Sequence, residues 1–347
     1  MCHKILNCTC VETKDGNIFR TLLDFQQPSK AVSYLKYYTS KNGTRIKGNC
    51  HYSKFRNMSE GENYVKSKLN NHWVKSQSLG SFIMIPGNKI TKIYDPVNEL
   101  QDLIKKPKKD YLENKICKLV NLISRKCEIP FDKIGISGSN LVGLSDSSVG
   151  SDIDLLVYGR SAAINLVKYL GRLKNLGFEH YSDSTRDKLI PRRQPGTIDG
   201  FNQETALKYE YTKTSGRFDN IHVNISPIRD NEAELPKIFK ATVSKKLGFC
   251  IVEAKIVNNQ EAVFVPPVYR VKVIKVIKGQ TFAHEVKFIV GSRFLHAQIG
   301  RKEQSLIFAG ILEQRTLKNT KFYDISLEPW ETVDGFIASN IGEIKHG

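Results

Sequence analysis

The chain has 347 residues, too many for one ordinary domain, which indicates two or three. Apolar residues make up 40%, enough to build hydrophobic cores, and Lys plus Arg exceed Asp plus Glu by 18. No apolar run has the length of a membrane span and no charged segment precedes a short apolar one, so we expect a cytoplasmic protein that does not enter a membrane.

The positive charge is concentrated in the two ends of the sequence. Residues 1–112 contain 19 basic and 9 acidic side chains, and residues 235–347 contain 17 and 10. Residues 113–234 contain 17 and 16, so the middle is nearly neutral. A lysine-rich composition alone would make the middle of the chain basic as well. The acidic residues of an active site there could, however, balance the basic ones. We interpret the flanks as surfaces that contact the phosphates of a nucleic acid.

The seven cysteines do not have the spacing of a secreted disulfide scaffold. Cys8, Cys10, Cys50 and His51 could meet around zinc, but neither cysteine-containing pair is a C-x-x-C motif. We therefore interpret the cysteines as reduced.

The first 110 residues alternate strand-like and helix-like segments, which predicts an N-terminal α/β module. The glycine-containing turns 14–17 and 41–43 are typical of hairpins. The apolar run 81–86 ends at Pro-Gly and predicts a strand. The basic run 105–109, broken by Pro107, predicts a solvated linker.

Residues 111–235 have the pattern of an α/β core. One buried helix face is predicted by the spacing i, i+3, i+4, i+7 of Ile116, Leu119, Val120 and Ile123. A short strand at 134–136 is followed by a turn, a half-buried strand at 153–157 and a second amphipathic helix at 163–173.

In residues 236–347 the apolar residues no longer have helical spacing. The short strands predicted there are 249–252, 269–274, 286–290, 306–308 and 322–325. Several short strands in so few residues favour a small barrel or sandwich. An OB-like barrel would bind nucleic acid, whereas other small barrels are purely structural, and both interpretations stay open.

The candidate metal-binding and phosphate-binding residues lie between 135 and 159. Side chains at i and i+2 of a strand share a face, about 6.5–7 Å apart, so Asp152 and Asp154 can hold Mg²⁺ between them. Gly138 lets the backbone approach a triphosphate closely, and Ser139 adds a hydroxyl at the start of a predicted helix. This combination predicts phosphates beside metal-binding carboxylates, with room for two ions.

Gly138-Ser139 followed by Ser151-Asp-Ile-Asp-Leu-Leu-Val157 resembles the signature of the DNA-polymerase-beta-like nucleotidyltransferase superfamily. More narrowly, the chain resembles an archaeal family of predicted nucleotidyltransferases, with looser matches at 12–19, 43–48 and 52–54. The resemblance implies that Gly138, Ser139 and Ser151 bind phosphates and that Asp152 and Asp154 bind magnesium.

The resemblance also implies a third carboxylate on a later strand. The best candidate strand is 221–227, where Asn224 stands at the expected place. Asp219 or Asp230 could substitute, or the carboxylate could be absent, and absence would point to weak catalysis or to binding only. The polar stretch 182–220, which contains Lys188, Arg192 and Arg193, is either a phosphate-gripping flap or a solvated loop.

The sequence therefore predicts an α+β protein with three parts: an N-terminal α/β module (1–110), a polymerase-beta-like nucleotidyltransferase core of a mixed sheet with flanking helices (111–235), and a C-terminal β-barrel-like domain (236–347). The expected reaction transfers a nucleoside monophosphate from an NTP to an acceptor, for which RNA is favoured. The alternatives are a catalytically inactive nucleotide-binding or nucleic-acid-binding protein and a protein-modifying transferase.

Overall fold

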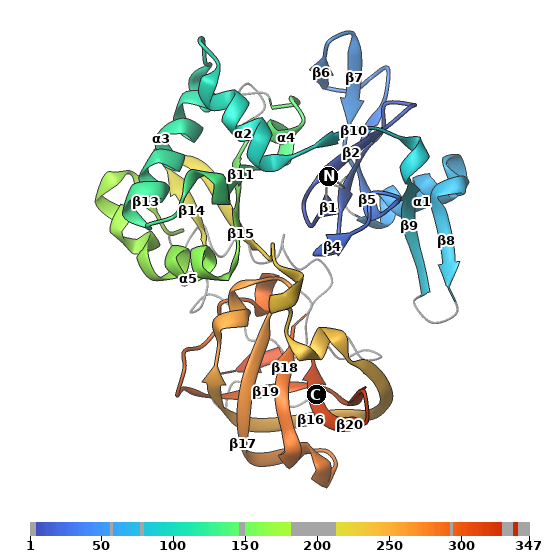
Figure 1. The fold of residues 1–347 in the computed structure, drawn as a ribbon, viewed down its shortest axis with the longest axis vertical. Helices are drawn as coiled ribbons and strands as arrows, with labels where there is room; N and C mark the ends of the chain where they lie inside the picture. Colours follow the sequence, from blue (N-terminus) through green and yellow to red (C-terminus); the bar gives the residue numbers. More distant parts are fainter. Residues whose placement is uncertain are drawn as a thin grey trace. The chain divides into compact units, whose positions relative to one another are not determined.

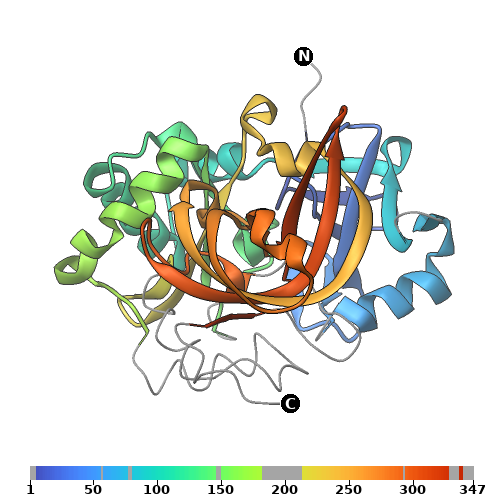
Figure 2. The same ribbon diagram turned by 90° about the horizontal axis from the view of Figure 1, so that it is seen from below.

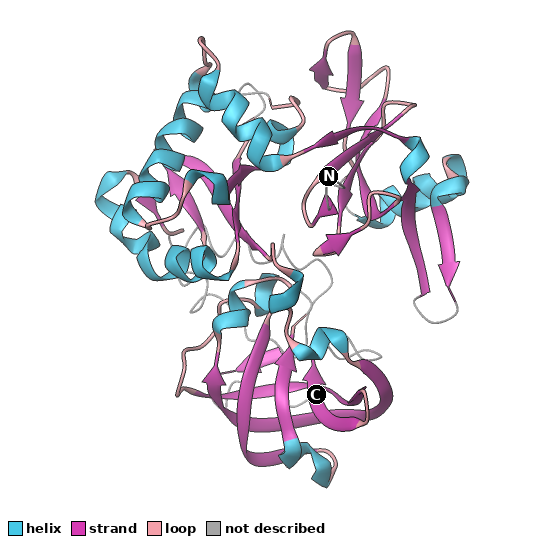
Figure 3. Cartoon of the chain, in the orientation of Figure 1, coloured by secondary structure: helices cyan, strands magenta, loops and turns pink. Residues whose placement is uncertain are grey.

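The computed structural model describes residues 5–55, 58–76, 80–145, 150–181, 213–291, 294–327 and 336–338. The expected α+β class is confirmed, with strands holding more of the described chain than helices (Figure 3). The chain divides into two compact units, residues 1–162 with 218–232 and residues 163–217 with 233–347. The three-part division at 110 and 235 stays a prediction. Within the described ranges, every helix is too short or too polar to span a membrane.

The first unit begins with an antiparallel sheet (blue to cyan in Figure 1). Its order is β10-β2-β3-β5-β7-β6, with β9 pairing both β5 and β8, and β1 pairs β4 separately. These strands are β1 (Ile5–Leu6), β2 (Cys10–Thr13), β3 (Ile18–Thr21), β4 (Phe25–Gln26), β5 (Lys30–Thr39), β6 (Arg45–Lys47), β7 (Cys50–Ser53), β8 (Trp73–Ser76), β9 (Gly80–Pro86) and β10 (Ile90–Tyr94).

One of the two predicted hairpins is confirmed. Strands β2 and β3 are joined by a turn in which Gly16 has a φ of +77°, a conformation that favours glycine. The hairpin predicted at 41–43 is wrong, because β5 pairs with β7 and the β6–β7 hairpin turns at Gly48. Gly43 is instead needed for packing, since a Cβ there would lie 2.4 Å from the backbone carbon of Tyr52.

The predicted α/β character of residues 1–110 needs correction. The described part of the N-terminal sheet is antiparallel, and neighbouring antiparallel strands need only short turns rather than crossover helices. Helix α1 (Met58–Lys68) packs against β5, where Tyr64 joins Tyr38 and Phe55 in an aromatic cluster. Helix α2 (Pro96–Lys105) packs on β11 (Ile134–Ile136), outside this sheet.

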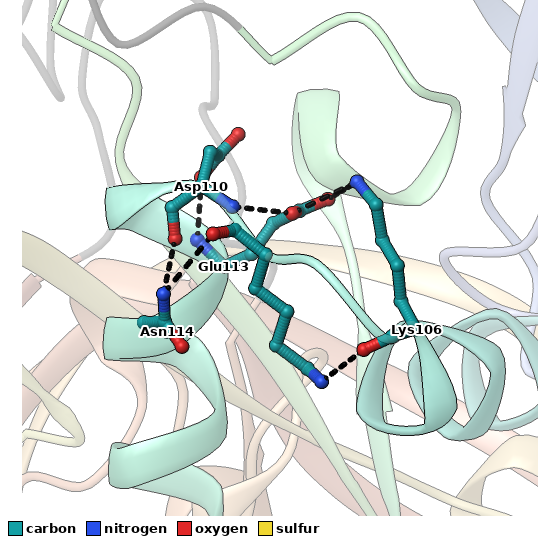
Figure 4. Close-up of polar contacts among 5 residues, drawn as sticks. Lys106, Asp110, Glu113 and Asn114 are labelled. Atoms are coloured by element: carbon teal, nitrogen blue, oxygen red, sulfur yellow. Dashed lines mark hydrogen bonds and ion pairs between the residues drawn. The ribbon is translucent and has the colours of Figure 1, made fainter.

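Helix α3 (Tyr111–Lys126) buries the predicted apolar stripe and begins at a capping box. Asp110 Oδ1 accepts from Glu113 N at 2.8 Å, and Glu113 Oε2 accepts from Asp110 N at 2.8 Å (Figure 4). Lys106, in the predicted linker, donates to Glu113 Oε1 at 2.7 Å. The basic run therefore connects two helices of one unit and is tied to the start of the second helix.

A five-stranded sheet carries the sequence motif. Its order is β11-β12-β15-β14-β13, in which β11 is antiparallel and β15 parallel to β12. Its other strands are β12 (Ile153–Tyr158), β13 (Phe178–Glu179), β14 (Ser215–Phe218) and β15 (Ile221–Ile228). The helix predicted at 163–173 is observed as α5 (Arg160–Tyr169) followed by a 3-10 segment at 170–176.

Strand β12 is buried on both faces beyond its first two residues, rather than half-buried as predicted. Ile153, Leu155 and Val157 are fully buried on one face. On the other face, Leu156 and Tyr158 pack in a cluster with Cys8, Ile228, Leu6 and Val97. The N-terminal segment therefore covers a face that sequence periodicity would leave to solvent.

The second unit contains the predicted C-terminal strands, of which the one at 286–290 has the predicted bounds and the other four are longer than expected. Five of them are β16 (Thr242–Asn258), β17 (Val268–Lys278), β18 (Val286–Val290), β19 (Ser305–Leu317) and β20 (Thr320–Ser326), and β21 (Phe336–Ala338) pairs with β19. The order β16-β17-β18-β20-β19 returns to β16, because β16 pairs with both β17 and β19 (Figure 2). The five strands thus form a closed barrel around a hydrophobic core.

Short 3-10 segments connect many of the strands. They are η1 (Asn70–His72), η2 (Gly87–Lys89), η3 (Phe131–Lys133), η6 (Glu232–Glu234), η7 (Lys237–Lys240), η8 (Gln260–Val263), η9 (Thr281–Glu285) and η10 (Phe294–His296).

Candidate functional site

The glycine turn and the second aspartate of the motif are in direct contact. Gly138 has a φ of +65°, and a Cβ at this position would lie 2.1 Å from Asp154 Oδ2. Only a residue without a side chain allows the carboxylate to lie so close to the turn. The structure therefore brings together the two halves of the predicted site.

Two hydrogen bonds hold the turn against β12. Ser137 N donates to Asp154 O at 2.8 Å, and Asn140 Nδ2 donates to Asp152 O at 3.0 Å. Helix α4 (Gly138–Leu141), which follows the turn, has only four residues. The helix predicted to start at Ser139 is therefore too short to provide a substantial dipole, and the backbone of the turn is the relevant feature for an anion.

The three residues predicted to bind phosphate have little exposed surface. Gly138 is buried, Ser139 is 9% exposed and Ser151 is 8% exposed. Sequence reasoning did not identify Ser137, whose buried hydroxyl oxygen has no hydrogen-bond partner within the described chain. A buried hydroxyl of this kind usually has a partner, so it is a further candidate for ligand contact.

The carboxylates of Asp152 and Asp154 differ in their surroundings. Asp152 is exposed, whereas Asp154 is half-buried beside Gly138. Although Asp152 keeps exposed surface, desolvation by surrounding atoms and the neighbouring Asp154 carboxylate raise its pKa, while His222, Lys54 and Arg45 act in the opposite direction. A cation between the two carboxylates would remove this repulsion.

Strand β15 provides a neutral side chain where a third carboxylate was expected. In the parallel pairing of β12 with β15, Asn224 is the residue paired with Asp154. The Asn224 amide donates from Nδ2 to Ser226 Oγ at 3.2 Å. His222, two residues earlier, is close enough to Asp152 to influence its pKa.

The two substitutes considered for the third carboxylate are engaged elsewhere. Asp219 Oδ2 accepts from Lys115 Nζ at 2.6 Å and from Lys118 Nζ at 3.1 Å, both on α3. Asp230 follows the far end of β15 and accepts from Lys133 Nζ at 2.7 Å. Neither hydrogen bond places these carboxylates with the aspartate pair, so Asn224 is the residue that neighbours Asp154 on the next strand.

The N-terminal sheet supplies positive charge to the site, which sequence periodicity could not reveal. Arg45 donates from Nη1 to the carbonyl oxygen of Leu144, three residues after α4. Partial burial, Arg45 and Lys36 lower the pKa of Lys54, while Asp152 and Asp154 raise it. Arg45 and Lys54 therefore lie within electrostatic range of the carboxylates, although about 100 residues separate them in the chain.

The earliest segment that carries the family resemblance has a different role. Glu12 accepts a hydrogen bond from the Tyr94 hydroxyl, and Lys47 Nζ lies 3.5 Å from Glu12 Oε2. These contacts connect β2, β10 and the β6–β7 hairpin. Glu12 therefore links the hairpin that carries Arg45 to β10.

No match to this chain was found among known protein families, curated proteins or solved structures.

The residues present fit one magnesium ion. Asp152 immediately precedes β12 and Asp154 is its second residue, and the two carboxylates interact electrostatically. Such a pair suits Mg²⁺, which completes an octahedral shell with water and substrate phosphates. In the described ranges, no three His, Cys, Asp or Glu side chains gather closely enough to enclose a metal by themselves. Asp152 and Asp154 would hold the ion together with its phosphate ligand, and a second ion stays a prediction.

Other predicted ligands lie outside the described residues or have other contacts. Lys188, Arg192 and Arg193 fall in residues 182–212, which are outside the described residues. For the zinc hypothesis, Cys8 is buried and accepts from Arg20 Nη2 at 2.8 Å, whereas Cys50 is exposed. These contacts give no support for a zinc site.

A cavity of about 770 Å³ in the second unit is not lined by any of the predicted site residues. Its basic lining residues are Lys168, Lys213 and Arg301, and Lys213 is 1% exposed. This cavity is therefore not the predicted site, despite its volume.

Proposed function

We propose that the chain is a magnesium-dependent nucleotidyltransferase with a polymerase-beta-like core, transferring a nucleoside monophosphate from an NTP to an acceptor, with RNA favoured. The observation that carries the proposal is the contact between Gly138 and the Asp154 carboxylate. It gives one place where a polyphosphate and a cation can be bound together.

In this proposal each side chain has a defined task. Asp152 and Asp154 hold magnesium, which when bound supplies a Lewis acid that neutralises charge on the phosphates. The backbone at Gly138 and Ser139 accommodates the β- and γ-phosphates, for which the absence of a Cβ leaves room. Arg45 and Lys54, which interact electrostatically with the carboxylates, offset the remaining phosphate charge.

Asn224 does not act as the general base in this proposal. An amide is a poor general base and adds no negative charge for a second cation. In the proposal, an acceptor hydroxyl is therefore deprotonated by the more exposed Asp152 or by water.

The proposal is tested by incubating the protein with each labelled NTP, Mg²⁺ and total RNA or lysate protein. Wild type is expected to incorporate label into RNA, and Asp152→Asn and Asp154→Asn should each reduce incorporation by at least about 100-fold. Asp132→Asn, an exposed carboxylate in η3, is the matched control and should retain activity. Label on a polypeptide instead of RNA would favour a protein-modifying transferase.

A non-catalytic nucleotide-binding protein is the second candidate, because Asn224 stands beside Asp154 in the sheet. This candidate predicts Mg²⁺-dependent NTP binding that is lost in Asp154→Asn, without incorporation of label by wild type under any acceptor condition.

A further inference from the structure

The outer face of β17 carries a row of four basic side chains. Its exposed charged residues are all positive: Arg270, Lys272, Lys275 and Lys278. None of the four makes an ion pair or a hydrogen bond through its side chain with another described residue. Lys275 is paired across the sheet with Glu253 on β16, so the row has four basic side chains and one acidic neighbour. The remaining positive charge forms a surface suited to a polyanion.

Two irregularities in the pairing with β16 keep these side chains on one face. Residues Tyr269, Val271 and Val273 point into the barrel core, so Arg270 and Lys272 point outward. The register then shifts between the pairs Ala254–Val273 and Glu253–Lys275, and again before Ile251–Lys278.

Without the first shift, strict alternation would turn Lys275 toward the core. Bulges commonly re-aim a side chain in this way. Here they place all four charges outward.

The basic row has a like-charged neighbour on β16, and an ion pair reduces the resulting repulsion. Lys272 is directly opposite Lys255 on β16, a like-charged pair that is unfavourable in an isolated sheet. Lys255 is ion-paired with Glu303, which offsets part of this repulsion.

Ile274, at the first bulge, is 57% exposed beside the basic side chains and offers an apolar surface for a base.

The strand order of the barrel bears on the position of the basic row. Its hydrogen-bonded order starts with β16 and β17, and β18 is parallel to β20 while the other pairs in the ring are antiparallel. Five-stranded barrels of the OB type bind oligonucleotides on the face of their second and third strands. In chain order β17 is the second strand of this barrel.

We infer that the barrel is OB-like and that the outer face of β17 binds single-stranded RNA through Arg270, Lys272, Lys275 and Lys278. The inference deepens the proposed function, and its choice of RNA as the polyanion rests on that proposal. The face would hold the acceptor strand by its phosphates, in a way that does not depend on sequence.

The test measures binding of a fluorescein-labelled single-stranded RNA of mixed sequence by anisotropy over a range of salt concentrations. The variant R270Q/K272Q/K275Q/K278Q is compared with a control of equal charge change in the same unit, K240Q/K302Q/K318Q/K321Q, whose four lysines are also exposed. The row variant should bind on the order of 100-fold more weakly than wild type, and its salt slope should fall by about 0.7 for each phosphate that is no longer neutralised. The control should stay within about threefold of wild type.

Equal RNA binding by the row variant and the control would overturn the inference, leaving the four basic residues as ordinary solvated surface charges. So would equally effective competition by duplex RNA or by vesicles containing phosphatidylserine. Matching circular dichroism spectra and melting temperatures of the two variants exclude loss of folding as the cause.

Failure of the proposed function is distinguishable from failure of this inference. Asp154→Asn should bind the RNA as wild type does. RNA binding that depends on the row, without incorporation of nucleotide by wild type, would keep the inference and remove the catalytic proposal.

Discussion

The Asp154 carboxylate lies against the backbone of Gly138, so close that a Cβ on residue 138 would be 2.1 Å from Oδ2. Sixteen positions separate the two residues in the sequence. Their contact makes the strand carboxylate and the turn one structural unit, and a change to either is expected to alter both.

Gly138→Ala should abolish nucleotide transfer by displacing Asp154. The matched control is Gly143→Ala, because Gly143 has a similar φ of +67° and a Cβ added there would meet nothing within 4 Å. Both variants should lose about 1–2 kcal/mol of stability from the strained backbone. Only Gly138→Ala should also lose Mg²⁺-dependent NTP binding, measured by calorimetry. Equal activity of the two variants would mean that the contact has no functional role.

Asn224→Asp should increase affinity for divalent cations by about tenfold or more, since it places a carboxylate beside Asp154 in the sheet. Without metal, the same variant should be less stable than wild type because of the added like charge. Titration with Mn²⁺, followed by electron paramagnetic resonance, measures the affinity. Asn121→Asp on the exposed face of α3 serves as the control. An unchanged affinity in Asn224→Asp would place residue 224 away from the cation.

Arg45→Gln and Lys54→Gln should each raise the KM for NTP by about tenfold, because each removes one charge-assisted contact worth about 1.5 kcal/mol. The effect should weaken at high salt, since screening already reduces the attraction. Steady-state kinetics at low and high ionic strength give the values, with the exposed Lys41→Gln as control. A KM equal to that of the control would separate the N-terminal sheet from NTP binding.

The barrel should become less stable as the pH rises from about 4 to 7, because of Asp324. Burial raises the pKa of Asp324 to about 7, although Arg315 Nε donates to its Oδ1 at 2.8 Å and lowers the pKa. Between the ordinary pKa of an aspartate, about 3.9, and this value, the folded state binds more protons than the unfolded state. The free energy of unfolding therefore falls through this window.

Asp324→Asn should remove that dependence. The stability of wild type relative to the variant should decrease by up to about 4 kcal/mol between pH 4 and pH 7.5. Hydrogen exchange in β19 and β20, compared between the two proteins at each pH, measures the difference locally. A constant difference across this range would show that the carboxylate titrates normally.

Much of the core was predictable, because its signals are local. The apolar period of α3, the strand at 153–157 and the Gly138 turn follow from side-chain spacing, and the structure has all three. The burial of Leu156 was not predictable, since it results from the N-terminal residues Leu6 and Cys8 packing on that face.

The remaining features of the site depend on contacts between distant segments. Arg45 reaches the carbonyl of Leu144 through the pairing of several strands, which no local pattern encodes. Four of the five barrel strands were predicted too short for a related reason. The first part of β16, residues 242–248, contains Ser244, Lys245 and Lys246, and its extended form is set by its pairing with β19. The bulges that aim Lys275 outward likewise appear only in the pairing register.

The central claim is nucleotidyl transfer at the Asp154–Gly138 site, and the position of the label in the products tests it most directly. Parallel reactions would contain the preferred NTP labelled either at the α-phosphate or at the γ-phosphate, with Mg²⁺ and RNA. The account predicts that α-label becomes attached to RNA and γ-label is released as pyrophosphate, and that both events disappear in Asp154→Asn. Attachment of γ-label to the acceptor, or no transfer of either label by wild type, would contradict it.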